Sequence, residues 1–517
     1  MRLIDFFDAS AAKSPKKIAF VQPDSHRITY AEAKAQSEQI AAAIDASVLA
    51  EDAKCAVFSP NDALAFIAML AIFRAGRVWV PLNARNTIED NAAFMASTRV
   101  ECLFFHSKFE AEALKLHESS PGLRLLVCLD GETDVGLSLS EFAASGRSLP
   151  DIAEDPQRVC NILATGGTTG RSKGTVWTNQ TWETLIATFW SSVPRSQAPT
   201  VHLCAAPMTH GAGILALMLM PAAATNVLLA KPDAAAVLKA IEEHKVTHMY
   251  LPPTVLYSML AHPDLKKTDL SSLTCFVITA APVAQEKLKE AIEAFGPVIC
   301  QTYGQSEAPM MLTYLSPDDH MKGMDDADSR LLRSCGKPTM FSRVEIMDEN
   351  GAILPTGETG EIVARSNLVM LGYYDNPEAT AEVSRFGWHH TGDVGYKNDE
   401  GYVFIVDRMK DMIITGGFNV YTTEVEQAVL AHPAVQDCAV FGVPDEKWGE
   451  AVKAVVELKP GADATPEAII AFLRPILGGV KTPKTVEVWD DLPRSPVGKV
   501  LKRKIRDKYW QGQTRAV

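Results

Sequence analysis

The sequence predicts an α/β protein with a large N-terminal domain and a smaller C-terminal domain. Its 517 residues exceed the roughly 250–300 residues at which a single hydrophobic core stops growing, so we expect at least two domains. Apolar runs alternate with helix-like runs through the first half, which is typical of parallel strands covered by helices. After about Ser334 the pattern changes to short strands separated by turns, which indicates a β-rich subdomain.

The first half contains the elements that support this fold class. Short apolar runs predict buried strands, and the longer runs between them predict helices. The expected strands are Cys55–Phe58, Val78–Pro81, Leu103–Phe105, Leu125–Leu129, Val246–Leu251 and Cys275–Thr279. The expected helices are Ala63–Arg74, Asp233–His244 and Ala284–Phe295.

The second half divides into two parts. Short strands are expected at Val344–Met347, Gly360–Ala364 and Tyr402–Val406, and a separate βα pattern at Ile413–Ile414, Thr423–Ala431, Ala434–Val443 and Ala451–Leu458. We predict an N-terminal domain over residues 1–406, with sheet subdomains over about 1–333 and the β-rich subdomain over about 334–406. A C-terminal domain would span residues 407–517, with the boundary near Asp407–Lys410.

Composition argues against several classes of protein. The formal net charge of −13 disfavours a nucleic-acid partner. The nine cysteines include no C-x-x-C pair, so neither a zinc site nor a disulfide framework is expected, and a reducing cytoplasm is the default location. Asp5 and Asp8 interrupt the N-terminal run, so no secretory signal is expected. Ile214–Ala224 is too short to span a bilayer, so we expect no integral membrane segment.

The strongest local signal is Thr165–Gly174, TGGTTGRSKG, which follows the apolar run Ile162–Ala164. Its four glycines and three threonines would let the backbone present N–H and hydroxyl groups to phosphate oxygens, and Lys173 adds a positive charge. A Walker loop ends in Gly-Lys-Ser/Thr, whereas Lys173 lies between Ser172 and Gly174, so a P-loop kinase or GTPase fits poorly. Taken alone, such a glycine-rich loop is as typical of a merely flexible connection as it is of a phosphate-binding loop.

Four further segments could contribute to a nucleotide site, although each alone is also typical of a surface turn. Gln301–Glu307, QTYGQSE, offers an aromatic face for a base and a carboxylate for Mg²⁺. Thr391-Gly392-Asp393 offers a carboxylate to ribose hydroxyls, and Arg408 in DRMKDMIITGGF offers a cation to ribose or phosphate. Lys499 follows a glycine turn in the basic segment PRSPVGKVLK.

In this order and spacing, the five segments resemble the adenylate-forming superfamily of acyl-CoA synthetases, firefly luciferases and nonribosomal peptide adenylation domains. The resemblance extends from Ile28-Thr29-Tyr30 to Lys499, nearly the whole chain. It implies a large N-terminal domain with two packed mixed αβ sheets and a β-rich subdomain, followed by a small mobile α+β C-terminal domain. Where this chain has Arg171-Ser172, the family usually has a residue followed by proline. The serine in place of that proline puts the rigidity of the loop in doubt.

The resemblance implies nucleotide-binding roles for residues of each segment. Those expected to hold the ATP phosphates are Thr165, Gly167, Thr168, Thr169, Gly170 and Lys173. Those expected around adenine are Tyr303 with Gly304 on one side and Ala280, Ala281 and Pro282 on the other. Ser306 would lie near the α-phosphate, Glu307 and Thr169 would hold Mg²⁺, and Asp393 with Arg408 would bind the ribose. Lys499 would bridge the substrate carboxylate and the α-phosphate.

Transfer to a thiol is implied by residues of the C-terminal domain. Lys410 matches the hinge about which this domain swings after adenylation, which would withdraw the catalytic lysine. The turn Gly416-Gly417-Phe418 would then face the thiol, and Asn419 matches a polar residue that touches the adenylate. Trp448-Gly449-Glu450 is expected to stabilise the small domain.

His210, in the segment PMTHGAG, matches the family residue that gates the acyl pocket. Peptide-synthetase domains usually place an aspartate in this region to pair with the substrate amine. None occurs between Pro207 and Leu219, so amino acids are not expected. Small and apolar neighbours indicate an uncharged acyl tail, aromatic or aliphatic.

The expected function is ATP-dependent ligation of a small-molecule carboxylic acid to coenzyme A, with Mg²⁺, by a monomer or homodimer in the cytoplasm. One alternative is an acyl-AMP ligase that loads a carrier protein, and another is a luciferase-like oxygenase. A non-catalytic nucleotide-binding homologue would have lost motif residues. All of those expected are present, namely Thr169, Lys173, Glu307, Asp393, Arg408 and Lys499. The sequence leaves open which acid is used, the acceptor, the oligomeric state and the pathway.

Overall fold

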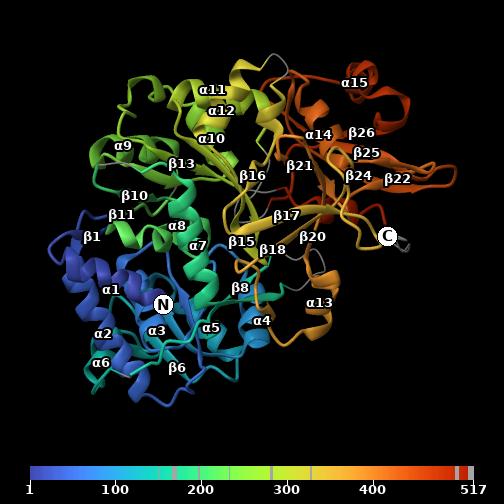
Figure 1. Cartoon of the computed structure of the whole chain (residues 1–517). Helices are drawn as coiled ribbons and strands as arrows, with labels where there is room; N and C mark the ends of the chain where they lie inside the picture. Colours follow the sequence, from blue (N-terminus) through green and yellow to red (C-terminus); the bar gives the residue numbers. More distant parts are fainter. Residues whose placement is uncertain are drawn as a thin grey trace.

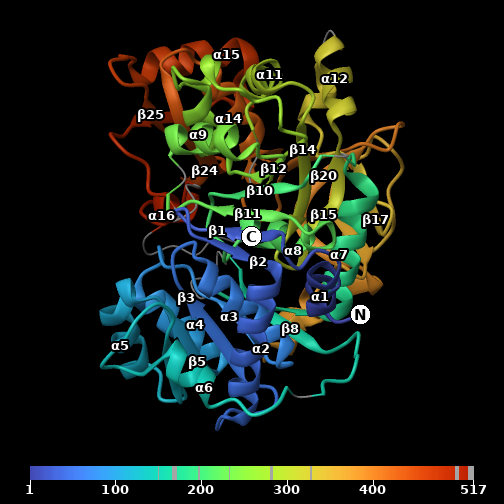
Figure 2. The ribbon, with the colours of Figure 1, turned by 90° about the vertical axis from the view of Figure 1, so that its left-hand side faces the viewer.

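The computed structural model describes residues 1–149, 151–165, 172–195, 198–231, 233–279, 283–326, 329–494 and 500–510. In Figures 1 and 2, most of the blue-to-cyan part of the chain lies below the green part. The red C-terminal part lies beside the green and yellow segments in both views. These regions correspond to the two sheet subdomains and the C-terminal domain.

A large mixed sheet forms the upper region. Within the described residues it has nine strands in the order β16-β15-β14-β13-β12-β10-β11-β1-β2, parallel from β14 to β1 and antiparallel at both edges. The strands are β1 Ile18–Val21, β2 Arg27–Thr29, β10 Val201–Cys204, β11 Thr225–Leu228, β12 His248–Tyr250, β13 Cys275–Ile278, β14 Ile299–Gln305, β15 Ala308–Leu315 and β16 Lys337–Pro338.

A second mixed sheet forms the lower region. In the described part of the chain it has eight strands in the order β19-β9-β8-β4-β3-β5-β6-β7, with β9 and β19 antiparallel to their neighbours. Its strands are β3 Lys54–Phe58, β4 Val78–Pro81, β5 Val100–Phe105, β6 Leu125–Cys128, β7 Leu137–Ser138, β8 Val159–Ala164, β9 Gly174–Thr178 and β19 Gly372–Tyr373. The edge strand β19 comes from the middle of the β-rich stretch of sequence.

Helices pack between and around these two sheets. Helix α3 is buried at every position except Leu64, because all of its residues but the last, Arg74, are apolar. It begins where the Asp62 carboxylate accepts the N–H groups of Leu64 and Ala65. One buried core joins α1, α2, α3, α7 and α8 to strands of both sheets. The helices before residue 400 are α1 Leu3–Lys13, α2 Tyr30–Ala46, α3 Ala63–Arg74, α4 Ile88–Thr98, α5 Glu110–Glu118, α6 Leu139–Ala144, α7 Asn179–Ser192, α8 Gly211–Met218, α9 Ala234–His244, α10 Pro253–Leu260, α11 Gln285–Phe295, α12 Pro317–Asp325 and α13 Pro377–Glu382.

The β-rich subdomain is an antiparallel sheet in the order β17-β18-β20-β21. Its strands are β17 Ser342–Met347, β18 Gly360–Ser366, β20 His389–Lys397 and β21 Val403–Arg408. Buried side chains of β17, β18 and β21 pack against Tyr303, Ala308 and Leu312 of the large sheet. The subdomain therefore shares its core with the strands that carry the QTYGQSE segment.

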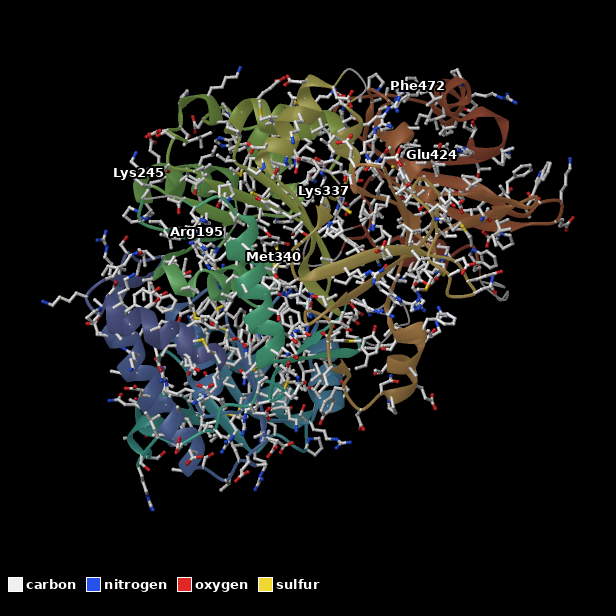
Figure 3. The ribbon with its side chains drawn as sticks, viewed as in Figure 1. Arg195, Lys245, Lys337, Met340, Glu424 and Phe472 are labelled. Atoms are coloured by element: carbon white, nitrogen blue, oxygen red, sulfur yellow. The ribbon has the colours of Figure 1, made fainter. Side chains whose placement is uncertain are left out.

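The C-terminal domain has a sheet in the order β23-β22-β25-β24, with β26 parallel to β25. Its elements are β22 Ile413–Thr415, β23 Phe418–Val420, α14 Thr422–Leu430, β24 Val435–Asp445, β25 Gly449–Leu458, α15 Pro466–Lys481, β26 Thr485–Val488 and α16 Lys502–Arg506. Helices α14 and α15 pack together: Glu424 pairs with Lys481 at 2.7 Å, and the Phe472 ring lies 4.9 Å from His432 (Figure 3).

This architecture confirms the predicted fold class, but two segments differ locally from expectation. Strand β14 continues through Gln301–Gln305, so most of the QTYGQSE segment is strand and only its end is a turn. The Thr391-Gly392-Asp393 segment lies inside β20, where Gly392 has a φ of +69° that favours glycine. Among the described residues, no helix is both long and apolar enough to cross a bilayer.

Candidate active site

The base of the glycine-rich loop is held closed by its two flanking strands. The Thr165 N–H donates to the Lys173 carbonyl at 2.9 Å, and the Lys173 N–H donates to Thr165 Oγ1 at 3.3 Å. The predicted phosphate-binding residues Gly167, Thr168, Thr169 and Gly170 lie outside the described residues. The Lys173 ammonium lies 4.8 Å from the centroid of the Tyr373 ring, which is cation–π range.

Tyr303, Gln305 and Asp393 form a buried cluster between β14 and β20. The Tyr303 hydroxyl donates to Asp393 Oδ2 at 2.7 Å, and the Gln305 amide donates to the same oxygen at 2.9 Å and to the Thr391 carbonyl at 2.8 Å. Burial, and then the negative charge of Asp393, raise the pKa of Tyr303 well above its usual value. The phenol therefore stays protonated and donates to the carboxylate. The predicted adenine and ribose residues meet here.

Arg408 completes this cluster from the neighbouring strand. It is the register partner of Asp393 across β20 and β21, and its Nε lies 3.5 Å from Asp393 Oδ1. The Arg408 side chain is 41% exposed, so the guanidinium remains accessible beside a carboxylate that is 8% exposed. The two residues predicted to bind ribose are thus brought together.

Glu307 lies in the turn between β14 and β15. Its Oε1 accepts the Tyr373 hydroxyl at 2.6 Å, and its carbonyl accepts the Met370 N–H at 2.7 Å. Burial, followed by the charge of Glu307, raises the pKa of Tyr373, so this hydroxyl also donates. Next to Glu307, the Ser306 carbonyl accepts the Trp177 indole N–H at 2.7 Å.

The donor set around Glu307 fits Mg²⁺ of a bound nucleotide. A carboxylate oxygen is the hard ligand that Mg²⁺ prefers. The described residues contain no cluster of three or more His, Cys, Asp or Glu that could hold a metal ion. An ion here would therefore take most of its ligands from phosphate oxygens and water, as Mg²⁺ commonly does in nucleotide sites.

His210 lies at the start of α8, at the end of the loop that follows β10. Its side chain is exposed to solvent, and the partial loss of hydration among the surrounding protein atoms, with a smaller effect of the Arg85 charge, lowers the pKa of His210. The ring is therefore neutral at pH 7. Its Nδ1 lies 3.1 Å from Thr209 Oγ1.

The opposite wall predicted for adenine is only partly described. Thr279 follows β13, and its hydroxyl donates to the Thr302 carbonyl at 2.7 Å, which ties the end of β13 to β14. Ala280, Ala281 and Pro282 lie outside the described residues. Gly304 lies in β14 between Tyr303 and Gln305.

Lys410 lies two residues after the end of β21, close to the cluster just described. Loss of hydration, then the positive charge of Arg408, lower the pKa of Lys410, while the charges of Asp411, Asp393 and Glu307 act in the opposite direction. The residue predicted to be the hinge is thus within electrostatic reach of the residues predicted to bind ribose and Mg²⁺.

The turn predicted to face the thiol forms the tip of the β22–β23 hairpin. Gly416 has a φ of +56°, and a side-chain carbon there would lie 2.6 Å from the Trp448 ring, so glycine is required. Phe418 is 61% exposed and Trp448 is 42% exposed. Asn419 pairs with Ile414 in the same hairpin. In Figure 1 strand β22 extends outward, away from β15 and β20.

Lys499 and its neighbours 495–498 lie outside the described residues, although the chain on both sides is held together. A β-bridge joins Arg494 to Val500, and the Leu501 N–H donates to the Pro493 carbonyl at 2.7 Å. Beyond them, Lys502 pairs with Glu426 of α14 at 2.9 Å. The described residues that flank Lys499 in the sequence are therefore held on the body of the C-terminal domain.

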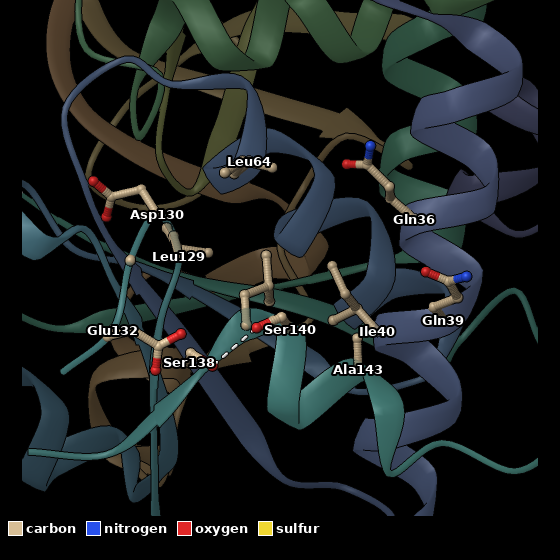
Figure 4. Close-up of a pocket in the computed structure, with 12 residues that line it drawn as sticks. Gln36, Gln39, Ile40, Leu64, Leu129, Asp130, Glu132, Ser138, Ser140 and Ala143 are labelled. Carbon is tan, nitrogen blue, oxygen red and sulfur yellow. Dashed lines mark hydrogen bonds between the residues drawn. The ribbon is translucent and has the colours of Figure 1, made fainter. Parts of the chain in front are cut away.

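A pocket of about 450 Å³ lies elsewhere, between α2, α3, α6 and the end of β6 (Figure 4). Ile40, Leu64 and Leu139 line it together with the acidic residues Asp130 and Glu132. None of the predicted site residues lines this pocket.

Two residues that contact the candidate site had not been singled out in the sequence. Gln305 lies within the QTYGQSE segment, so its place in the motif was a usable signal. Tyr373 lies 66 residues from Glu307, and nothing local in Gly372-Tyr373-Tyr374 distinguishes one tyrosine from the other. Only the pairing of β19 with β9 reveals its position.

Comparison with known proteins agrees with this geometry. Residues 7–374 match the AMP-binding enzyme family, and residues 424–499 match the C-terminal domain of AMP-binding enzymes. The chain is 38% identical over 451 residues to the medium/long-chain-fatty-acid–CoA ligase FadD8 of Mycobacterium tuberculosis, covering 84% of this chain and 78% of that protein. It is 35% identical over 508 residues to a feruloyl-CoA synthase of Amycolatopsis sp, covering 96% and 97%.

The fold agrees with solved structures as well. The amide bond synthetase McbA from Marinactinospora thermotolerans superposes with a TM-score of 0.88 at 31% identity, covering 98% of this chain and 100% of that one. Fold and site thus define an adenylate-forming enzyme. The chain belongs to the AMP-binding enzyme family, and it is an acid–thiol ligase.

Proposed function

We propose that this chain is an ATP-dependent carboxylate–CoA ligase. It would adenylate a carboxylic acid with release of pyrophosphate, and then form the acyl-CoA thioester with release of AMP. The observation that carries the proposal is the assembly of Tyr303, Asp393 and Arg408 beside Glu307 and Lys410, which the fold brings together from three separate segments. The family relationship supports the same chemistry.

The first half-reaction follows from the charges in this assembly. Asp393 and Arg408 would hold the ribose, the ring of Tyr303 would stack on adenine, and Lys173 would hold the phosphates. A carboxylate attacks the α-phosphorus, so two anions must be brought together and negative charge grows in the transition state. Lys499 would neutralise that charge, and Mg²⁺ held near Glu307 would supply further electrostatic stabilisation. Positioning by the cluster contributes the rest.

The second half-reaction would use the C-terminal domain in another orientation. We propose a hinge at Lys410, between the end of β21 and the start of β22, which is three residues beyond the predicted domain boundary at residue 407 inside β21. Rotation at this point would remove Lys499 and bring Gly416, Gly417 and Phe418 to the thioester site. The exposure of Phe418 and the outward position of the hairpin support an orientation that suits the first half-reaction.

An uncharged acyl tail is the substrate class that the pocket residues favour. His210 is neutral at pH 7, and Ala308 and Met311 of β15 are buried beside the Glu307 turn. Relatives named for medium- and long-chain fatty acids and for ferulate both use acids whose tails carry no charge. Aliphatic and aromatic tails are both compatible with these residues.

The test is an ATP- and CoA-dependent AMP-release assay against a panel of acids, from acetate to palmitate and including benzoate, cinnamates and amino acids. Release of AMP with consumption of CoA for one acid class, abolished in Lys499→Ala, is the expected result. Pyrophosphate exchange without consumption of CoA would indicate a ligase that loads a carrier protein. Absence of both activities with every acid would contradict the proposed function.

A further inference from the structure

Tyr373 contacts two residues that the proposed function assigns to the nucleotide. Its hydroxyl donates to Glu307 Oε1 at 2.6 Å, and its ring lies 4.8 Å from the Lys173 ammonium. Glu307 and Lys173 come from different sheets, β14–β15 and β8–β9, and they do not form an ion pair with each other. Tyr373, itself half-buried, therefore stands between two opposite charges.

The backbone around Tyr373 is tied to both of these regions. Tyr373 pairs with Thr175 across β19 and β9, and the Tyr374 N–H donates to the Gly174 carbonyl at 2.8 Å. The Met370 N–H donates to the Glu307 carbonyl at 2.7 Å. Residues 370–374 are thus fixed on one side to the strand that leaves the glycine-rich loop, and on the other to the Glu307 turn.

The chemistry of tyrosine suits this position. A phenol hydroxyl donates a charge-assisted hydrogen bond to a carboxylate, which fixes the orientation of that carboxylate. The face of the ring carries negative charge density, which attracts an ammonium without neutralising it. A lysine and a glutamate brought into direct contact would instead form an ion pair, and nucleotide binding would have to break it. Tyr373 gives each charge a partner and keeps the two apart.

We infer that Tyr373 is a positioning residue for the nucleotide, whose hydroxyl orients Glu307 toward Mg²⁺ and whose ring seats Lys173 toward the phosphates. The inference rests on the proposed function, because it takes Glu307 and Lys173 as the Mg²⁺ and phosphate residues. The inference adds a residue of β19, Tyr373, that contacts both Lys173 and the proposed Mg²⁺ ligand Glu307.

Two substitutions separate the two contacts. Tyr373→Phe keeps the ring under Lys173 and removes the hydrogen bond to Glu307, whereas Tyr373→Leu removes both. The matched control is Tyr374→Phe at the neighbouring position, where the ring lies 5.6 Å from Lys54 and away from Glu307. Melting temperatures of all variants without ligand establish that each is folded.

The first measurement is pyrophosphate exchange as a function of Mg²⁺ at saturating ATP. Loss of one hydrogen bond to a charged group corresponds to about a tenfold change in an equilibrium constant. We expect Tyr373→Phe to need about tenfold more Mg²⁺ for half-maximal exchange, and Tyr373→Leu to raise the KM for ATP as well. Tyr374→Phe is expected to match the wild type in both quantities.

The second measurement needs no turnover. Calorimetric titration with ATP, with and without Mg²⁺, should show that Tyr373→Phe loses most of the gain in affinity that Mg²⁺ gives the wild type. Wild-type Mg²⁺ dependence in Tyr373→Phe, in both measurements, overturns the inference and leaves the proposed function intact. A wild-type protein that neither exchanges pyrophosphate nor binds ATP overturns the proposed function itself.

Discussion

At the scale of single residues, Asp393 is the centre of the candidate site. Its Oδ2 accepts the Tyr303 hydroxyl and the Gln305 amide, and its Oδ1 faces Arg408. A carboxylate with three donors around it has a fixed orientation, which is what recognition of a ribose by hydrogen bonds requires. Tyr303 would thus have two roles, because its ring is proposed to stack on a base and its hydroxyl donates to Asp393.

Tyr303→Phe separates these two roles. The ring remains for stacking, but Asp393 loses one of its donors, so we expect the KM for ATP in pyrophosphate exchange to rise about five- to tenfold while kcat changes little. Tyr314→Phe is the control, because Tyr314 lies on the adjacent strand β15 and its hydroxyl contacts Cys300 instead. An unchanged KM in Tyr303→Phe would show that its hydroxyl does not contribute to nucleotide binding.

At the scale of elements, the start of α14 joins β21 to the segment that follows Lys499. The Asp407 carboxylate accepts the N–H of Thr422 at the start of the helix, and the Thr422 hydroxyl donates to it at 3.0 Å. Lys502 donates to Thr422 Oγ1 at 2.8 Å and pairs with Glu426. Burial raises the pKa of Asp407 and of Glu426, and the Lys502 charge opposes both shifts. The Lys502 charge therefore favours the ionised form of both carboxylates.

Lys502→Met tests this arrangement. Glu426 would lose its cationic partner in a largely buried position, so we expect the C-terminal domain to lose about 2 kcal/mol of stability. Adenylation should also fall, because Lys502 fixes the chain next to Lys499. Urea denaturation and pyrophosphate exchange measure the two effects, with Lys502→Arg as the charge-conserving control. A stable variant with normal exchange would show that Lys502 does not anchor this segment.

The large sheet holds several neutral histidines in its interior. His202 of β10 and His248 of β12 are register partners, and burial lowers the pKa of each to about 4. Burial also lowers the pKa of His320 in α12 to about 4. In the unfolded chain a histidine titrates near about 6.5, so below that pH the unfolded state takes up protons that the native state excludes.

The free energy of unfolding should therefore decrease as the pH is lowered from about 6.5 to about 4, and it should be nearly constant above about pH 7. One buried neutral histidine can lower the free energy of unfolding by as much as about 3 kcal/mol near pH 4. Urea midpoints followed by tryptophan fluorescence between about pH 7 and pH 5 measure the effect. His202→Gln should reduce the slope and a change at the exposed His117 should not. Equal slopes in all three proteins would contradict the assignment.

At the scale of the whole molecule, the N-terminal domain holds the proposed nucleotide residues, and the C-terminal domain holds the exposed β22–β23 hairpin and is proposed to supply Lys499. The connection between them runs from the end of β21 at Arg408 to the start of β22 at Ile413. Lys410 lies within it and within electrostatic reach of Asp393 and Glu307. A rotation of the domain at this point would therefore move a charge next to the nucleotide.

Lys410→Pro is expected to separate the two half-reactions. Proline fixes φ near −65°, so a rotation that needs another backbone conformation at this position is blocked. We expect pyrophosphate exchange to fall less than about tenfold and thioester formation more than about a hundredfold. Lys410→Ala, which removes the charge but keeps backbone freedom, is the control. Equal losses in both assays would contradict a hinge at this residue.

Local sequence patterns were sufficient to predict the bounds of buried helices and strands. Helix α3 and strand β4 have the predicted bounds, because uninterrupted apolar runs flanked by an Asp cap or a proline leave few alternatives. The segment Gln301–Gln305 was described as typical of a surface turn, yet it continues strand β14. Its polar side chains are retained since they point to partners on other elements, such as Asp393 and Thr391. Partners on distant elements cannot be predicted from the local sequence pattern.

The residues of the candidate site also differ in whether the sequence pattern could predict them. The order of the motifs was enough to predict Tyr303, Asp393 and Arg408, which the fold brings together. Tyr373 was missed, because its role depends on a two-residue strand that pairs with β9 almost 200 residues earlier in the chain. Long-range pairing of this kind leaves no periodicity that a sequence window could detect.

The same two-residue strand limits how the protein can be divided. Strand β19 covers the free edge of β9, although it lies beyond residue 334 in the sequence. A fragment that stops before it would leave the β9 backbone groups that face β19 without partners, while those that face β8 stay paired, and such an open edge is a template for pairing with another chain. Expression of residues 1–333 alone should therefore yield self-associating material, whereas a fragment ending after residue 408 would keep this edge closed.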